Sequence, residues 1–244
     1  MPHLHSLRHA APMLLSTPDG AALHVTETGR GAPLLLLSGG PGCVNYLAPV
    51  AALLPGWRCV LPDPRGVGGS GGGPHGVAQA VQDIETLREA LKLPHWTVLG
   101  HSWGADLGLA YALAHPGRVR HLVSFAGTGV QYDRDWKAAY EAGKHLEADF
   151  EVEWNPEVHT ALRGDWRRYI KEPELFSRLS RSEVSVTFLH MGADIRPGWP
   201  ARQLAALLPR AAFVELPGAS HNAWLETASQ LQAALISVLD GSLP

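Results

Sequence analysis

Residues 95–116 read HWTVLGHSWGADLGLAYALAHP: a short apolar run, a tight turn with two glycines around one serine, and a longer apolar run. The first run has the length of a strand over 95–100, and the last has the length of a helix over 105–116. The turn has the pattern G-x-S-x-G, in which small residues at Gly100 and Gly104 avoid clashes while Ser102 is pushed outward. The stretch therefore predicts a strand-to-helix turn that presents Ser102 as a nucleophile.

The alternation of strand and helix continues on both sides of this turn. Residues 13–28 predict a hairpin around a Pro-Asp-Gly turn, and residues 44–55 predict a helix interrupted or kinked at Pro49. Further strands are expected at 33–37, 57–63, 119–127, 184–192 and 211–218, and further helices at 77–93, 200–209 and 222–240. This order predicts an α/β fold with a mostly parallel, doubly wound sheet and helices on both faces.

One segment breaks the alternation. Residues 129–181 contain no apolar run typical of a buried strand and are charged, helical in pattern and rich in tryptophan. Asn155-Pro156 and Glu172-Pro173 have the pattern of helix starts. We expect a core domain formed by residues 1–128 and 182–244 and a small helical cap, or lid, formed by 129–181. An insertion that only packs on the core remains the alternative.

Composition excludes several classes of protein. The chain has 244 residues, 45% of them apolar, and a net charge of −3 with both signs mixed along it, which argues against a nucleic-acid or membrane partner. No apolar stretch approaches the roughly 18 residues of a membrane span, and the first residues lack the apolar core of a secretory signal, so a cytoplasmic protein is expected. Cys43 and Cys59 are expected to be free thiols, and His3 and His5 to have only incidental affinity for metals.

A serine hydroxyl needs a base, and the base needs an acid that holds it. Asp194 follows the strand expected at 184–192, and His221 follows the strand expected at 211–218. Both therefore lie where the order Ser, Asp, His places a catalytic acid and base. Other histidines and acids are less well placed and are interpreted as structural: His101, His115, His190, Asp63 and Asp106.

The glycine-rich loop after the strand at 33–37 reads SGGPGC. It lacks the glycine spacing and the lysine of phosphate-binding loops, whereas an oxyanion hole needs one backbone N–H from such a loop and one from the residue after the nucleophile. Because proline has no N–H, Gly40 is the expected donor, with Gly39 as the second choice and Trp103 as the partner donor. Gly39 and Cys43, together with Trp136 of the expected cap, are the candidates for contacting substrate.

The segments SGGPG, DPRGVGGS (63–70) and GHSWG, followed by Asp194 and His221, resemble the α/β-hydrolase superfamily over most of the chain. They are similar in particular to its proline iminopeptidase-like branch. The resemblance implies a serine hydrolase without metal or cofactor that acts on a small ester, amide or short peptide. In that branch Asp63 and Arg65 belong to a segment that shapes the turn beside the site.

The chain also departs from this branch. Ser38 and His101 replace a histidine and a glycine of the branch's motifs, and the expected cap is short. The cap's glutamates match no amine-binding motif and are interpreted as solvated carboxylates: Glu141, Glu147, Glu151, Glu153 and Glu157. Aminopeptidase and carboxylesterase activities therefore stay open, as do a C–C bond hydrolase on the same triad and a non-catalytic binding protein. The oligomeric state is not predicted.

Overall fold

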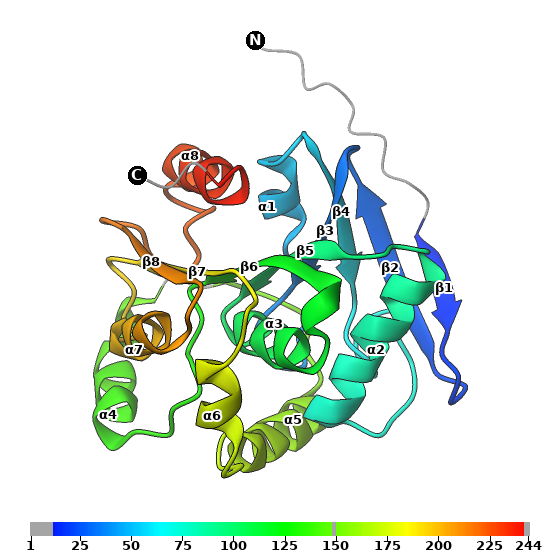
Figure 1. The fold of residues 1–244 in the computed structure, drawn as a ribbon, viewed down its shortest axis with the longest axis horizontal. Coiled ribbons are helices and arrows are strands. Elements are labelled where there is room, and N and C mark those ends of the chain that lie inside the picture. The colour runs from blue at the N-terminus through cyan, green and yellow to red at the C-terminus, as the bar shows by residue number, and fades with distance from the viewer. Residues whose placement is uncertain (1–11, 148–149, 242–244) are drawn as a thin grey trace.

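An eight-stranded sheet runs through the computed structural model, which describes residues 12–147 and 150–241 (Figure 1). Its strands lie in the order β1-β2-β4-β3-β5-β6-β7-β8. Strand β2 is antiparallel to both of its neighbours, and from β4 to β8 all neighbouring strands are parallel. The strands are β1 (Met13–Ser16), β2 (Ala22–Thr28), β3 (Ala32–Leu37), β4 (Trp57–Pro62), β5 (Trp96–His101), β6 (Val119–Phe125), β7 (Val186–Met191) and β8 (Ala211–Leu216).

Helices cover both faces of the sheet, which confirms the predicted fold class. In Figure 1, α1 and α8 lie on one face and α2, α3 and α7 on the other. The helices are α1 (Ala48–Ala52), α2 (Val77–Ala90), α3 (Trp103–Ala114), α4 (Arg134–Gly143), α5 (Pro156–Tyr169), α6 (Leu175–Ser180), α7 (Trp199–Leu207) and α8 (Ala228–Leu239). Two short 3₁₀ turns complete the set, η1 (Pro116–Arg118) and η2 (Lys144–Leu146). His3 and His5 lie outside the described residues.

The apolar core is divided by the sheet into two clusters. Successive side chains of a strand point to opposite faces, so Leu35 and Leu37 of β3 join the cluster under α2 and α3. Leu34 and Leu36 join the cluster under α1 and α8. The run of four leucines is therefore continuous because both of its faces are buried.

Two expected helices differ in extent from the structure. Pro49 does not kink a helix; it lies in the first turn of the short α1, where its missing N–H has no cost. The helix expected from residue 222 begins at Ala228. Turn hydrogen bonds, such as the one from the Leu225 N–H to the Asn222 carbonyl, use the backbone groups that would otherwise start it.

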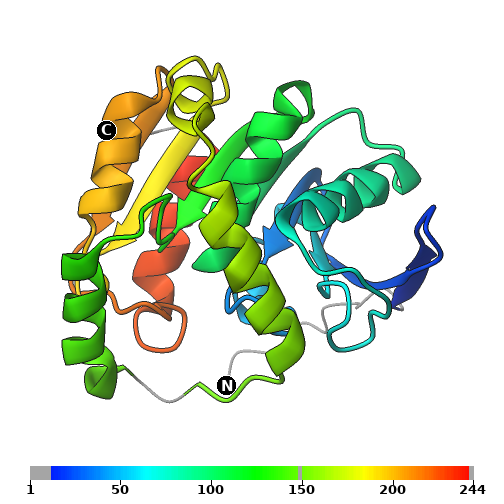
Figure 2. The ribbon, with the colours of Figure 1, turned by 90° about the horizontal axis from the view of Figure 1, so that it is seen from below.

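Three helices, α4, α5 and α6, lie between β6 and β7. The expected start of α5 is confirmed, because the Asn155 side chain accepts hydrogen bonds from the N–H groups of Glu157 and Val158. Helix α5 buries Val158, Leu162 and Trp166 in the same cluster as α2 and α3. Figures 1 and 2 place α4 beside α7, away from α5.

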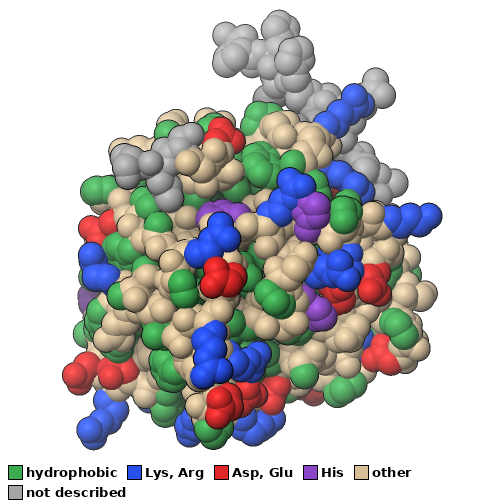
Figure 3. All heavy atoms as spheres, in the orientation of Figure 1, with side chains coloured by type: hydrophobic (Ala, Val, Ile, Leu, Met, Phe, Trp, Pro, Cys, Tyr) green, Lys and Arg blue, Asp and Glu red, His purple; other side chains and the backbone are tan. Residues whose placement is uncertain are grey.

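The surface carries charges of both signs. On the face in Figure 3, Lys and Arg side chains lie among Asp and Glu side chains, and this face has no broad area of one sign. In the described part of the chain, no helix has the length and apolar character needed to cross a bilayer.

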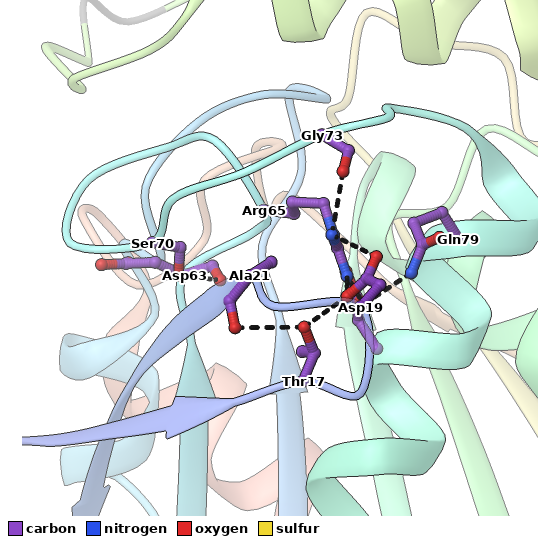
Figure 4. A network of polar contacts seen from close by, with 9 residues as sticks. Thr17, Asp19, Ala21, Asp63, Arg65, Ser70, Gly73 and Gln79 are labelled. Atoms are coloured by element: carbon purple, nitrogen blue, oxygen red, sulfur yellow. Dashed lines mark hydrogen bonds and ion pairs between the residues drawn. The ribbon is translucent and has the colours of Figure 1, made fainter.

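Arg65 is the centre of a buried polar network that joins three elements (Figure 4). Its guanidinium donates to Asp83 of α2 at 2.5 and 2.8 Å, to Asp19 of the β1–β2 turn at 2.8 and 3.1 Å, and to the Gly73 carbonyl at 3.1 Å. Its side chain is 4% exposed. The ion pairs of Arg65 with Asp83 and Asp19 thus fix the position of the segment DPRGVGGS.

We expect Arg65→Ala to lower the free energy of unfolding by about 3–5 kcal/mol, because it leaves the buried Asp83 carboxylate without its cation. Urea unfolding measures this loss. The control is Arg178→Ala, which removes an exposed ion pair with Glu172 and should cost less than about 1 kcal/mol. Equal losses in the two variants would contradict the structural role of Arg65.

Asp106 of α3 is a buried carboxyl group, 2% exposed, at the point where the chain leaves β6. It accepts hydrogen bonds from the Gly129 N–H at 2.8 Å and from the Thr128 hydroxyl. Burial raises its pKa from 3.8 to about 7. Between these pH values the folded protein holds a proton that the unfolded chain has lost, so this group makes stability fall as the pH rises from about 4 to about 7.

Asp106→Asn removes this pH dependence. Relative to the parent protein, the variant's free energy of unfolding should rise by about 2–3 kcal/mol between pH 5 and pH 8. Urea unfolding at several pH values measures the difference. A difference that stays constant from pH 5 to pH 8 would show that the carboxyl group ionises normally in the folded protein.

Candidate active site

Loops that are far apart in sequence meet at the carboxyl ends of the parallel strands. Leu37, the last residue of β3, pairs with Gly100 of β5, so the loop beginning at Ser38 lies beside the turn at Ser102. The chain passes from β3 to β4 on one side and later to β5 on the other, and such switch points are where α/β sheets bind ligands. On the neighbouring strands, the Ala193 N–H donates to the Ala219 carbonyl at 2.9 Å and joins the loops of Asp194 and His221.

Ser102 occupies a strained turn. Its backbone has φ 55° and ψ −127°, a conformation that costs a non-glycine residue roughly 1–3 kcal/mol. The flanking glycines make this turn possible. A Cβ atom on Gly100 would lie 2.2 Å from the Gly104 carbonyl oxygen, and a Cβ on Gly104 would lie 2.2 Å from that of Leu37. The Ser102 N–H donates to the Phe125 carbonyl at 2.9 Å, which ties the turn to β6.

Asp194 and His221 form a buried pair. The distance from His221 Nδ1 to Asp194 Oδ2 is 2.6 Å, and the two side chains are 7% and 2% exposed. Burial opposes the ionisation of Asp194, but the hydrogen bond and charge of His221, helped by Arg196, lower its pKa from 3.8 to about 2. Asp194 is therefore an anion at neutral pH and fixes the orientation of the imidazole.

Arg196 connects Asp194 to the segment between β6 and β7. Its backbone N–H and its Nη1 donate to Asp194 Oδ1 at 3.0 and 3.1 Å. The same guanidinium donates to both oxygens of Glu147 at 2.7 and 3.2 Å and lies 5.0 Å from the centre of the Tyr140 ring. The single positive charge of Arg196 is thus shared by two carboxylates. The charges of Asp194, Arg196 and Glu147 therefore sum to a net negative charge beside His221.

Tyr46 and His101 connect the glycine loop to the His221 loop. The Gly39 N–H donates to Tyr46 Oη at 2.8 Å, Tyr46 Oη lies 2.8 Å from His101 Nδ1, and His101 Nε2 lies 3.0 Å from the His221 carbonyl oxygen. A carbonyl only accepts, so His101 Nε2 carries the proton. Burial and the neighbouring His221 lower the pKa of His101, which keeps the ring neutral, so Tyr46 donates its hydroxyl proton to Nδ1.

The glycine loop has a backbone N–H, that of Gly40, without a hydrogen-bond acceptor among the described residues, and the loop lies against Ser102. Gly40 has φ +113°, and a Cβ there would lie 2.3 Å from Cys43 Sγ, so a side chain is excluded. Since the Gly39 N–H is bound to Tyr46, it is not available to a substrate. The Gly40 N–H donates to no group in the described part of the chain, and the Trp103 N–H opens a helix, where no intrahelical acceptor exists.

The same loop is held from outside by residues 153–159. The Val44 N–H donates to the Glu153 carbonyl at 3.0 Å, and the Asn155 N–H to the Gly42 carbonyl at 2.9 Å. His159 Nδ1 donates to the Pro41 carbonyl at 2.7 Å. These bonds act as a short strand pair and fix the conformation of the loop.

The remaining predicted contact residues lie around this centre. Cys43 is buried beside Gly40, and burial raises the pKa of its thiol. Cys43 and Cys59 are both free thiols. Trp136 stacks on Tyr140, whose other contact is the guanidinium of Arg196 5.0 Å from its ring centre. Within residues 12–147 and 150–241 no group of three or more His, Cys, Asp or Glu has the arrangement of a metal site.

Sequence reasoning missed Tyr46 and Arg196, and it was wrong about Glu147. This glutamate was expected to be a solvated carboxylate, but its side chain is 23% exposed and is paired with Arg196. Tyr46 and Glu147 lie in segments without a motif, and their partners are far away in sequence. Arg196 follows Asp194 by two residues, and this spacing was the one signal that could have indicated a contact. His101 was interpreted as structural, and its two hydrogen bonds agree with that interpretation.

Comparison with known proteins adds independent evidence. A family model described as "alpha/beta hydrolase fold" matches residues 32–163, just over half of the 244 residues. A proline iminopeptidase of Arabidopsis thaliana is 40% identical over 118 residues, which are 45% of this chain and 30% of that protein. The matched part thus spans less than a third of that relative's length.

Solved structures match almost the whole chain. A proline iminopeptidase of Mycobacterium smegmatis has a TM-score of 0.72 at 19% identity, covering 95% of this chain and 98% of its own. An esterase of Exiguobacterium antarcticum has a TM-score of 0.74 at 18% identity, covering 93% of this chain and 99% of its own. At these identities the likeness concerns the fold.

Tyr46→Phe tests the network that joins the two loops. The change leaves the Gly39 N–H and His101 Nδ1 without partners in a buried place, so we expect a loss of about 1–3 kcal/mol in the free energy of unfolding. Urea unfolding measures it. Tyr140→Phe is the matched control, because the Tyr140 hydroxyl makes no hydrogen bond to the described residues. A loss no larger than the control's would contradict the network.

Proposed function

Because the chain belongs to the alpha/beta hydrolase fold family, we propose that it is a serine hydrolase that cleaves small ester or amide substrates through an acyl-enzyme. The observation that carries the proposal is the buried Asp194–His221 pair, 2.6 Å apart, at the same sheet edge as the strained turn of Ser102. A carboxylate that orients a histidine, at the sheet edge where a serine occupies such a turn, has the chemistry of a nucleophile and its base.

In the proposed mechanism Ser102 attacks the acyl carbon and His221 accepts its proton. The negative oxygen that develops on the substrate accepts hydrogen bonds from the N–H groups of Gly40 and Trp103. The start of α3 beneath Ser102 adds a favourable dipole. His221 then protonates the leaving group, and a water molecule, activated by the same histidine, releases the acid.

In the same proposal, residues 129–181 act as the cap of a core formed by residues 1–128 and 182–244. Support comes from the contacts of this segment with both halves of the site. Residues 153–159 bind the glycine loop, and Glu147 binds the arginine that holds Asp194. The cap thus contributes to the position of the oxyanion donor and of the catalytic acid.

Aminopeptidase activity is the second candidate, because relatives that share the motif-bearing part of the chain are named proline iminopeptidases. Recognition of a free substrate amine needs a carboxylate without a cation of its own. The cap glutamate beside the triad acid, Glu147, is paired with Arg196, and Glu141 is paired with Lys144. Because Glu147 is the glutamate joined to Asp194 through Arg196, its pairing favours an uncharged acyl group, and therefore esters or simple amides, over an aminoacyl group.

Ser102→Ala should abolish hydrolysis of 4-nitrophenyl acetate and butanoate and covalent labelling by a fluorophosphonate probe. The reason is that both reactions need the hydroxyl oxygen as nucleophile. Labelling is read by gel fluorescence and by the mass of the modified peptide. The control is Ser38→Ala, which should keep the label on the peptide of Ser102. Full labelling of the Ser102→Ala protein would overturn the assignment.

Asp194→Asn separates the role of the acid from folding. An asparagine keeps the size of the side chain but no longer stabilises the correct histidine tautomer, so kcat should fall by on the order of 10³–10⁴-fold. Circular dichroism should show that the variant is folded. Kinetics like those of the parent protein would mean that another acid acts with His221.

A further inference from the structure

The end of helix α4 packs directly on the loop that carries Asp194. A Cβ atom on Gly143, the last residue of α4, would lie 2.8 Å from Ile195 Cβ, so the two segments are in contact there. Glu147 follows shortly after α4 and binds Arg196, the residue after Ile195. Two successive residues of the Asp194 loop are thus held by the same part of the segment between β6 and β7.

The ion pair of Arg196 and Glu147 has the geometry of a strong interaction. The guanidinium donates to both oxygens of the carboxylate, at 2.7 and 3.2 Å, and the two side chains are 14% and 23% exposed. The guanidinium also lies over the Tyr140 ring of α4. A bidentate pair with little exposure is only weakly screened by salt, whereas the neighbouring pair of Glu141 with Lys144 is exposed.

Arg196 connects this pair to the proposed base through one carboxylate. The backbone N–H and Nη1 of Arg196 donate to Asp194 Oδ1, and Asp194 Oδ2 lies 2.6 Å from His221 Nδ1. With Glu147, the side chains form one continuous series of contacts that ends at the imidazole. The charges along this series alternate in sign once His221 is protonated.

Two further titratable groups face His221 from the opposite side. His101, at the end of β5, has its ring centre 4.6 Å from that of His221, and burial lowers its pKa, which keeps the ring neutral. The Tyr46 hydroxyl binds His101, and burial raises the pKa of this hydroxyl, so Tyr46 is neutral as well. Neither group brings a charge to His221 at neutral pH.

On the side of β7, His190 interacts electrostatically with both Asp194 and His221, and burial lowers the pKa of His190. Arg202 of α7 and Glu215 of β8 also act on His190, but they are exposed and pair with each other at 3.5 Å. Among the residues that the structure describes, the charges linked to His221 and shielded from solvent are therefore those of Asp194, Arg196 and Glu147.

We propose that Arg196 and Glu147 are positioning residues of the hydrolase, which set the pH at which His221 becomes able to accept the proton of Ser102. The proposal rests on the proposed function and names the residues that adjust its base. Arg196 alone would oppose the protonation of His221, because it brings a positive charge to Asp194. Glu147 offsets that charge, so the segment between β6 and β7 acts on the base through Asp194.

The test is the pH dependence of kcat/KM for phenyl acetate between about pH 5 and pH 9, because its acidic limb reports the base of the free enzyme. Glu147→Gln keeps the size of the side chain and removes its charge. The midpoint of the acidic limb should move to lower pH by about 0.5–1 unit, since the uncompensated guanidinium disfavours the imidazolium. Arg196→Met should move it to higher pH by a similar amount. The double variant should return to within about 0.2 unit of the parent protein, because the net charge is restored.

Two control variants separate this role from a structural one. Glu141→Gln removes a charge from the same segment but breaks only the exposed pair with Lys144, so it should leave the midpoint unchanged. Arg196→Lys keeps the charge but cannot form two parallel hydrogen bonds with Glu147, and it should keep the midpoint of the parent protein whatever its effect on kcat. Asp106, whose pKa is about 7, is present in every variant, so its titration cancels in these differences.

A second readout does not need turnover. The ring protons of His221 can be titrated by NMR, with their signals assigned by comparison with a His221→Asn variant. The midpoint of this titration should move in opposite directions in Glu147→Gln and Arg196→Met, as the acidic limb does. Circular dichroism shows which variants are folded.

The outcomes separate the two levels of the proposal. If phenyl acetate is not hydrolysed in a Ser102-dependent way but the NMR midpoints move as expected, the proposed function fails and the charge coupling to His221 stands. If the ester is hydrolysed and Glu147→Gln moves neither midpoint more than Glu141→Gln does, the function stands and the role of Arg196 and Glu147 is overturned. Shifts of the same sign in Glu147→Gln and Arg196→Met would also overturn it, because a loss of structure and not of charge would explain both. Should Arg196→Met not fold, the comparison of the two glutamate variants still decides.

Discussion

The close contact between β3, β5 and α3 at Gly100 and Gly104 is the constraint on which the site depends. Backbone atoms occupy the space that a Cβ would need at either glycine, within 2.2 Å of a carbonyl oxygen. This close backbone packing lets the chain turn sharply from β5 into α3, with Ser102 as the one strained residue of the turn, at the end of the strand. Because β3 lies against the same turn, its glycine loop is brought to Ser102 by the packing that forms the turn.

Much of this arrangement was predictable because it depends on local sequence and on strand order. The spacing of Gly100, Ser102 and Gly104 is typical of one turn geometry. The residues that follow parallel strands all lie at the same edge of the sheet, so their proximity could be expected. Tyr46 and Glu147 were not predictable, since their partners are brought to them only by the finished fold. The start of α8 was also misplaced, because turn hydrogen bonds compete with the helix where apolar periodicity alone favours it.

Electrostatics explains why an arginine beside Asp194 is compatible with the proposed chemistry. A lone guanidinium bound to this carboxylate would offset the negative charge that stabilises a protonated His221. Glu147 binds the same guanidinium with both oxygens, so the cluster of Asp194, Arg196 and Glu147 keeps one net negative charge. Glu147 thus preserves the net negative charge beside His221.

The pairing of residues 153–155 with residues 42–44 limits how the segment between β6 and β7 can move. An outward swing of α5 would break the hydrogen bonds that Glu153, Asn155 and His159 make with the glycine loop. Such a motion would therefore release the glycine loop from the contacts that fix its conformation. The two parts of this segment are thus held in different ways: Glu153 and Asn155 are bound to the glycine loop through backbone hydrogen bonds, whereas Tyr140 and Glu147 contact Arg196 through their side chains.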